Sequence, residues 1–499
     1  MNTHRFPRSA VALCLSMAGS APLWAAPATS PPKPPVLPAK TPPKAAPQAT
    51  AAPLLYVPPL AATTLESGSA RLSNGLTLIT RHDRLAPRVA FSLLIKAGAA
   101  DETPKSAGWR RLLADVMLRG SKNAAGADLK AADVQRAAEN LGGRSGATVS
   151  DDAIEFWAIG DSAKQGELLD LLLQMALRPR LADDDVDAAR DRLTTRLDTE
   201  SDNVPAQAVN ALRDQLYRNA ENVPVAYGLP GTGTDESLKS LTAARLRALH
   251  RIFFAPSQMA LAAVGDLDEP TLRARLEKLE TSDAPDTTDA ELPHPGTVPH
   301  LVPPAKDKPP LVVRQLPVRG ATPTAWLFVG FAGPGADSAD LPALRVLCAA
   351  LGEMPRSRLE KRLLGASLIP GLDDPNVLQA AAQWTPRRYS GEMVVFAQTK
   401  AEKIEEIKNA LLDEIGKLRE SSLGAAELER ARNFARGGWA VERETLRDRA
   451  FQAAFSPVAN APADVKWPTR VAAVSAADVK RVAAKYLQNY AVTLVMPED

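Results

Sequence analysis

The amino-acid sequence predicts an α+β protein made of two similar domains, each with a mainly antiparallel sheet and helices packed on one face. A weak internal repeat gives both halves of the chain the same order of strand, loop and helix, and a linker rich in Pro, Asp and Thr separates them at residues 281–312. The domains are therefore expected at residues 63–280 and 313–499. The composition, 45% hydrophobic and 24% charged, is typical of globular domains with more than one core.

The repeat starts with a strand that ends at Ala-Gly, followed by a polar loop and an apolar helix. In the first half, the strand at 89–98 precedes a helix that begins at Trp109. In the second half, the strand at 324–333 precedes a helix over 341–351. Each half then continues with an amphipathic helix and a charged helix, at 168–177 and 183–197 in the first half and at 404–418 and 425–442 in the second.

Each half also closes in the same way, with a helix, a turn and a strand. Residues 241–266 follow this order in the first half and residues 474–496 in the second. Ser475 and Asp478 have the spacing of a capping box at the start of the last helix. Alternating apolar residues predict further strands at 75–80, directly after an Asn-Gly turn, and at 153–159.

The N-terminus carries a targeting signal. Arg5 and Arg8 precede an apolar run over 10–23 that ends in small residues, so residues 1–26 are predicted to be a cleavable signal peptide. Residues 27–62 are rich in Pro with Lys and Ala between, which favours an extended tether of polyproline type. The mature chain is therefore expected in the periplasm or outside the cell, with no transmembrane segment.

Charge and cysteine content exclude several classes of function. The net charge of only +2 gives no reason to expect binding to nucleic acid. Cleavage of the signal peptide would remove Cys14 and leave Cys348 as the single thiol, so no intramolecular disulfide is expected. Cys348 lies in an apolar helix with no neighbouring His, which indicates a core residue rather than a nucleophile.

The most informative segment is Gly108–Ser121. Its apolar residues recur at helical spacing and form one stripe, and Gly120 follows where a helix usually ends. The frame resembles the inverted zinc motif, His-x-x-Glu-His, of the insulinase, pitrilysin and mitochondrial processing peptidase family (peptidase family M16). On that frame Arg111 and Asp115 replace the two histidines, and Ala114 replaces the catalytic glutamate.

The family's third ligand, a Glu on a later helix, aligns with Arg196 in the stretch that leads to Pro205. Arginine does not lose its proton at usable pH and alanine has no base, so the resemblance implies a member with no catalytic residues, no metal and no cofactor. We call Arg111, Ala114, Asp115 and Arg196 the substituted site. An alternative is a hydrolase with an unrecognised site, but the chain has no Gly-x-Ser-x-Gly elbow.

Other motifs extend the resemblance over nearly all of the chain after residue 63. Gly228–Thr232 matches the family's Gly-x-x-Gly-Thr turn, and Ser357-Arg358-Leu359 matches its Ser-Arg-Leu motif, which makes Ser357 and Arg358 candidates for substrate binding. The resemblance implies two M16-type domains arranged as a clam shell. The residues that follow Leu359 depart from the family pattern.

Two hypotheses concern the substituted site. In the first hypothesis, Arg111, Asp115 and Arg196 form a salt-bridge cluster with the net charge of a zinc ion held by one glutamate. Alternatively, Arg111 and Asp115 form only a solvated helix pair worth a few tenths of a kcal/mol. A structure in which Arg196 lies far from Asp115 would remove the first hypothesis.

The resemblance implies that inactive members pair with active ones. The expected function is a non-catalytic subunit of a heterodimer, with an active M16 zinc peptidase paralogue as partner and an extended peptide enclosed in the chamber. The alternative is a self-contained peptide-binding or envelope scaffold protein, which needs no peptidase partner.

Overall fold

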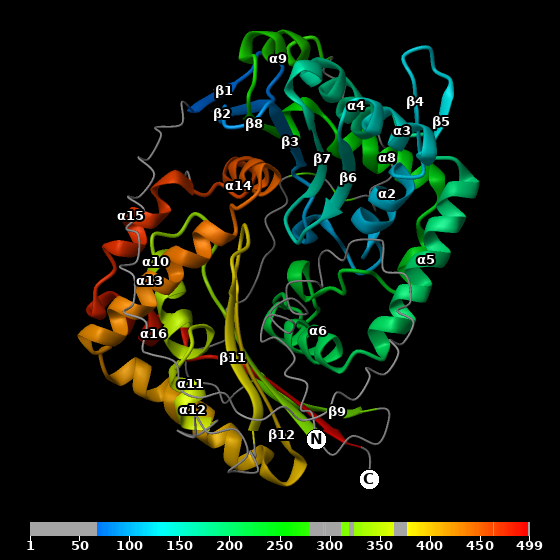
Figure 1. Cartoon of the computed structure of the whole chain (residues 1–499). Helices are drawn as coiled ribbons and strands as arrows, with labels where there is room; N and C mark the ends of the chain where they lie inside the picture. Colours follow the sequence, from blue (N-terminus) through cyan, green and yellow to red (C-terminus); the bar gives the residue numbers. More distant parts are fainter. Residues whose placement is uncertain are drawn as a thin grey trace, which may run out of the picture.

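The computed structural model describes residues 67–279, 293, 295, 311–318, 324–363, 377–462 and 464–497. The predicted signal peptide, the tether and most of the predicted linker lie outside these residues, so their boundaries stay predictions. The described residues form two α+β domains (Figure 1). None of the described helices has the length and apolar character needed to cross a membrane.

The N-terminal domain is built on a six-stranded sheet in the order β1-β2-β8-β3-β7-β6. All neighbouring strands are antiparallel except β2 and β8. The strands are β1 (Ser67–Arg71), β2 (Thr77–His82), β3 (Arg88–Ile95), β6 (Arg144–Val149), β7 (Ile154–Asp161) and β8 (Met259–Gly265), and β4 (Gly120–Lys122) and β5 (Asp128–Lys130) form a separate hairpin. The helices are α2 (Trp109–Met117), α3 (Ala131–Asn140), α4 (Gln165–Leu177), α5 (Asp183–Ser201), α6 (Val204–Leu216), α7 (Asp235–Ser240), α8 (Ala243–Phe253) and α9 (Glu269–Leu276).

The C-terminal domain repeats this plan with a five-stranded sheet in the order β11-β12-β10-β13-β9. Only β13 and β9 are parallel. The strands are β9 (Leu311–Val318), β10 (Thr324–Ala332), β11 (Val377–Thr385), β12 (Glu392–Lys400) and β13 (Ala491–Pro497). The helices are α10 (Leu341–Cys348), α11 (Arg358–Leu363), α12 (Ile404–Glu420), α13 (Ala425–Val441), α14 (Leu446–Val458), α15 (Trp467–Ala472) and α16 (Ala476–Tyr486).

The strand orders confirm the duplication. In the N-terminal sheet β8 lies between β2, to which it is parallel, and β3, to which it is antiparallel. In the C-terminal sheet β13 lies between β9 and β10 with the same two orientations, so β8 corresponds to β13. The capping box of α16 is present, since the backbone N–H of Asp478 donates to Ser475 Oγ at 3.1 Å. Apolar residues of the sheet, α2, α4 and α8 enclose Trp109, Phe91 and Phe156 in the N-terminal core.

The second face of each sheet is covered by a helix of the other domain. α14 packs on β3 and β8 of the N-terminal sheet, where Ala90, Ala262 and Ala454 are buried together. α6 packs in turn on β10 and β13, where Leu212 and Phe328 are buried together. Figure 1 shows both helices at these positions. The two domains of the expected clam-shell fold therefore close on each other through an exchange of equivalent helices, an arrangement that the internal repeat did not predict.

Candidate functional site

The substituted site lies where α2 packs against α5. The apolar stripe of α2 is fully enclosed at Trp109, Leu112, Leu113 and Val116, which fixes the direction of the polar positions between them. α2 starts after Gly108, which has φ 84°, and a Cβ there would lie 2.5 Å from the carbonyl oxygen of Thr232. Glycine thus allows the predicted Gly-x-x-Gly-Thr turn to close on the start of the helix.

The carboxylate of Asp115 faces α5. Its Oδ2 lies 3.5 Å from Arg192 Nη2, one helical turn before Arg196. Arg196 Nε donates instead to Glu200 Oε1 at 2.8 Å. Arg192 is therefore the side chain of α5 that pairs with Asp115, while Arg196 acts on the Asp115 carboxylate through its charge.

The remaining residues complete a charged cluster rather than an isolated helix pair. Arg111 Nε donates to the carbonyl oxygen of Gly231 at 3.4 Å, and Thr232 Oγ1 donates to Glu200 Oε1 at 3.0 Å. Burial and the charge of Arg196 lower the pKa of Arg111 to about 10. Arg111 thus stays protonated at neutral pH and within reach of the charge of Arg196.

Burial also acts on the acidic member of α2. It raises the pKa of Asp115 against the opposing charges of Arg192 and Arg111. With Arg196 and Glu200, the cluster contains three arginines and two carboxylates, which leaves one net positive charge. The net charge is the one that the cluster hypothesis expected, although the membership of the cluster is larger.

These residues do not fit a zinc ion. Zinc in proteins is held by thiolate, imidazole and carboxylate groups, and a hydrolytic site also needs a base. Asp115 is the only such donor at the substituted site and it faces Arg192. Ala114 is 4% exposed and carries no base. Within the described part of the chain, no three His, Cys, Asp or Glu side chains come together as a metal site.

Ser357 and Arg358 are both engaged in the structure of the C-terminal domain. Arg358 makes a two-pronged ion pair with Glu427 of α13, at 2.8 Å from Nε and 3.0 Å from Nη2. Ser357 is 2% exposed, and its Oγ accepts from the backbone N–H of Glu360 at the start of α11. The ion pair links α11 to α13 and the serine contact caps the start of α11, while substrate binding by the two residues stays a prediction.

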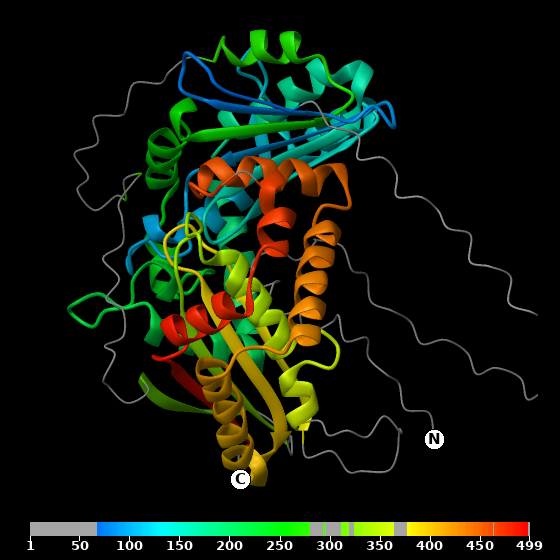
Figure 2. The same cartoon turned by 90° about the vertical axis from the view of Figure 1, so that its left-hand side faces the viewer.

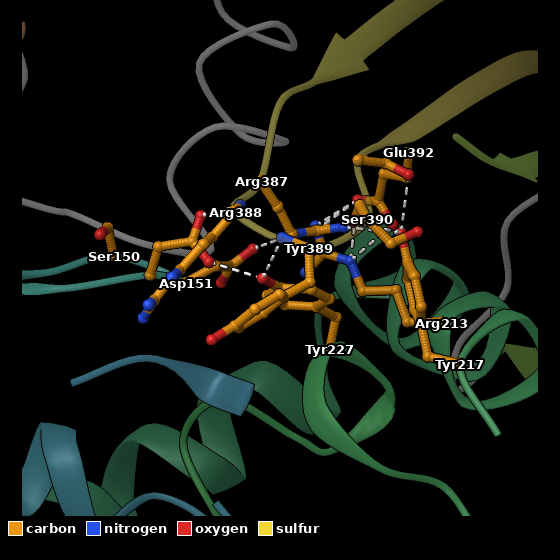
Figure 3. A network of polar contacts seen from close by, with 12 residues as sticks. Ser150, Asp151, Arg213, Tyr217, Tyr227, Arg387, Arg388, Tyr389, Ser390 and Glu392 are labelled. Atoms are coloured by element: carbon orange, nitrogen blue, oxygen red, sulfur yellow. Dashed lines mark hydrogen bonds and ion pairs between the residues drawn. The ribbon is translucent and has the colours of Figure 1, made fainter. Parts of the chain in front are cut away.

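A buried polar network joins the two domains and was missed by the sequence analysis (Figure 3). At its centre Arg387, in the β11–β12 turn, is fully buried. Its Nε donates to Asp151 Oδ2 at 2.6 Å, its Nη2 to Glu392 Oε1 at 2.8 Å and its Nη1 to Tyr217 Oη at 3.0 Å. Arg213 of α6 also donates to Glu392, at 2.6 Å from Nη2. This network ties the β6–β7 turn and α6 to the C-terminal sheet.

Burial and charge shift the pKa values of two acids in this region in opposite directions. Although burial opposes ionisation, Arg213 and Arg387 lower the pKa of Glu392 to about 2. Burial raises the pKa of neighbouring Asp152 to about 6, while the hydroxyl of Tyr227 donates to it at 2.6 Å. The sequence signal that could have indicated this network is the Asp-Asp and Arg-Arg doublets, each in a turn between two strands.

Comparisons with known proteins place both domains in one family. The model of the insulinase family, peptidase family M16, matches residues 77–231, and the model of the peptidase M16 inactive domain matches residues 240–434. The chain belongs to peptidase family M16. Within the family it is similar to a probable mitochondrial-processing peptidase subunit beta of Arabidopsis thaliana, with 22% identity over 435 residues that cover 84% of this chain and 76% of the relative.

Other relatives agree on family and fold. An uncharacterized zinc protease of Streptomyces coelicolor is 23% identical over 197 residues, which are 40% of this chain and 41% of the relative. A protease from Helicobacter pylori has a TM-score of 0.74 at 19% identity, covering 87% of this chain and 100% of that chain. A peptidase M16 inactive domain from Pseudomonas fluorescens has a TM-score of 0.71 at 16% identity, covering 87% and 99%. The M16 fold is thus shared by both domains.

Proposed function

We propose that this chain is an exported, non-catalytic M16 subunit that pairs with an active zinc peptidase paralogue and helps to enclose its peptide substrates. The observation that carries the proposal is the substituted site. Arg111 and Asp115 take the places of the histidines and lie in a cluster of arginines and carboxylates, while the packing of α2 and α5 is kept. A chain with this scaffold and this cluster can supply walls and binding surface but no activated water.

The free edge of the N-terminal sheet supports a role in holding peptide. β6 is the edge strand, and α2 lies beside it. The backbone N–H of Ser150 donates to the carbonyl oxygen of Ala153 at 2.9 Å, so these two residues form a hydrogen-bonded pair. In an antiparallel ladder such pairs alternate with pairs whose backbone groups point away from the partner strand, and residues 145 and 147 of β6 fall in pairs of the second kind. Ser145 and Ala147 therefore present their backbone groups to the open edge, where an extended peptide can add as a strand.

The pairing is tested with purified proteins. Alone, the chain should hold no stoichiometric zinc in metal analysis and should cleave nothing in a peptide library. Mixed with a paralogue from the same cell that has an intact His-x-x-Glu-His motif, it should co-elute, and peptidase activity should appear or rise. Unchanged activity at every ratio, with no co-elution, would refute the pairing and favour the stand-alone scaffold.

A proline variant tests the role of the edge. Ser145→Pro removes an outward N–H and leaves the β6–β7 ladder intact, so it should raise KM of the mixed complex several-fold without loss of co-elution. The matched control is Ser69→Pro on β1, the opposite edge of the same sheet, where residue 69 is exposed. Equal effects of the two variants on KM would exclude β6 as the peptide edge.

Export is tested separately. Fractionation of the native cell should place the mature chain in the periplasm or the medium, and N-terminal sequencing should find the start of the mature chain near residue 27. Recovery in the cytoplasm with an intact N-terminus would refute export, and it would leave the pairing to be judged by the mixing experiment.

A further inference from the structure

A cavity of about 480 Å³ lies between the two domains, and none of the four residues of the substituted site lines it. The β6–β7 turn and α6 line it from the N-terminal domain, and α13, α14 and α15 line it from the C-terminal domain. Figure 1 shows these three helices on the left of the molecule and α5 on the right, and Figure 2 turns the three helices toward the viewer. The volume is in the range that encloses a small organic ligand.

The walls of the cavity are rich in aromatic rings. Phe451 and Phe455 stack on each other, with 5.9 Å between ring centroids. Trp384, Trp439 and Trp467 also line the cavity. Such walls favour an apolar ligand, and planar or branched groups fill them best.

The carboxylates that line the cavity all have partners. Asp151 pairs with Arg387 at 2.6 Å, and Asp152 accepts from the hydroxyl of Tyr227. Glu442 lies 3.5 Å from Arg345 Nη2 and is half exposed. A cationic ligand would have to compete with these internal partners.

Two donors in the lining lack an acceptor. Arg470 is half-buried, its guanidinium lies 5.8 Å from the ring centroid of Trp467, and it has no hydrogen bond or ion pair with any described residue. Burial lowers its pKa without an opposing charge. The indole Nε1–H of Trp439 is also buried with no acceptor among the described residues. A guanidinium and an N–H donor that share one cavity are the groups that recognise a carboxylate.

We propose that this cavity binds an apolar carboxylate, in which Arg470 pairs with the carboxylate, Trp439 donates a hydrogen bond, and the aromatic walls enclose the apolar group. A free aromatic or branched acid and the C-terminal residue of a peptide share this chemistry. Because both domains line the cavity, the ligand also stabilises their contact. The site needs neither the substituted site nor a partner subunit.

The test uses the full mature chain and calorimetric titration. The probes are N-acetyl-phenylalanine and its neutral amide, then Ala-Ala-Phe with a free or an amidated C-terminus. The acids should bind and raise the unfolding temperature, and the amides should bind at least about tenfold more weakly because a charge-assisted bond is lost. A tripeptide acid that binds tighter than the free acid assigns a peptide C-terminus, and the reverse order assigns a small acid.

Variants locate the site. Arg470→Gln should weaken the acids about tenfold and leave the amides unchanged, and Trp439→Phe should weaken both about fivefold. The matched control is Arg436→Gln, an exposed arginine of α13 outside the cavity, which should change nothing. Three outcomes would each overturn the proposal. The unmodified chain binds acid and amide equally, it binds no acid at a probe concentration of about 10 mM, or the Arg470→Gln variant binds the acids as tightly as the unmodified chain does.

Discussion

Substitution of Arg387 by methionine tests the network that joins the domains. The side chain of Arg387 is 1% exposed and contacts both domains, through Asp151 on one side and Glu392 on the other. It also stacks on Tyr227, with its guanidinium carbon 4.9 Å from the ring centroid. Methionine keeps most of the apolar volume but removes every hydrogen bond, so the variant isolates the electrostatic part of the contact.

The expected loss follows from what each partner keeps. Removal of one member of a buried ion pair costs about 3–5 kcal/mol, because the remaining charge stays buried. Glu392 keeps Arg213 at 2.6 Å, and the side chain of Asp151 is 38% exposed and so remains partly hydrated. The loss should therefore lie near the lower end, at about 3 kcal/mol.

The loss is measured as the free energy of unfolding in urea at pH 7. Arg136→Met is the control, because the Arg136 side chain is 69% exposed and water screens its ion pair with Asp133, so its loss should change the free energy of unfolding far less. The pKa of Glu392 is about 2 in the folded chain and about 4 in the unfolded chain, so its ionised form stabilises the fold above about pH 4. This contribution is lost as the pH falls toward 2. The gap between wild type and variant should therefore narrow in acid. A loss below about 1 kcal/mol at pH 7 would refute the reasoning.

Three further results are expected. Burial raises the pKa of Asp101 to about 6, so its contribution to stability is full below about pH 4 and is lost as the pH rises to 6. The free energy of unfolding in urea should therefore fall by on the order of 2 kcal/mol between these pH values, and Asp101→Asn should remove this fall. A Cβ on Gly330 would lie 2.6 Å from Leu212 Cδ2, so Gly330→Ala should cost about 1–3 kcal/mol, and Leu212→Ala in the same chain should relieve part of it by a double-mutant cycle. A third test restores the motif on α2, with His at 111 and 115 and Glu at 114. In that background Arg192→Glu should complete a site that binds zinc in metal analysis, whereas Arg196→Glu should not, because Arg192 is the residue opposite Asp115.

The fold could be predicted because the local signals agree with one another. Periodicity placed α2, and the capping pattern placed the start of α16 at Ser475. The two Ala-Gly strands and the two closing helix-turn-strand units became equivalent parts of two sheets with the same order. Each of these signals acts within about 20 residues, a range over which sequence pattern reflects structure directly.

Long-range contacts could not be predicted in the same way. α6 and α14 are ordinary amphipathic helices in sequence, and nothing local tells which sheet each one covers. Which arginine of α5 pairs with Asp115 depends on the rotation of that helix, because Arg192 and Arg196 are one helical turn apart. Asp151 and Arg387 are 236 residues apart, so only the folded domains bring them together.

The substituted site and the interdomain network use arginine for the same physical reason. A buried carboxylate requires a nearby positive charge, and a metal ion or a guanidinium can supply it. At α2 and α5, Asp115 and Glu200 have arginine partners in place of a metal. The contact between the two helices is therefore complete without an ion, whereas an emptied zinc site would leave its ligands unpaired. A family member built in this way can therefore keep the packing of α2 on α5 without a metal ion.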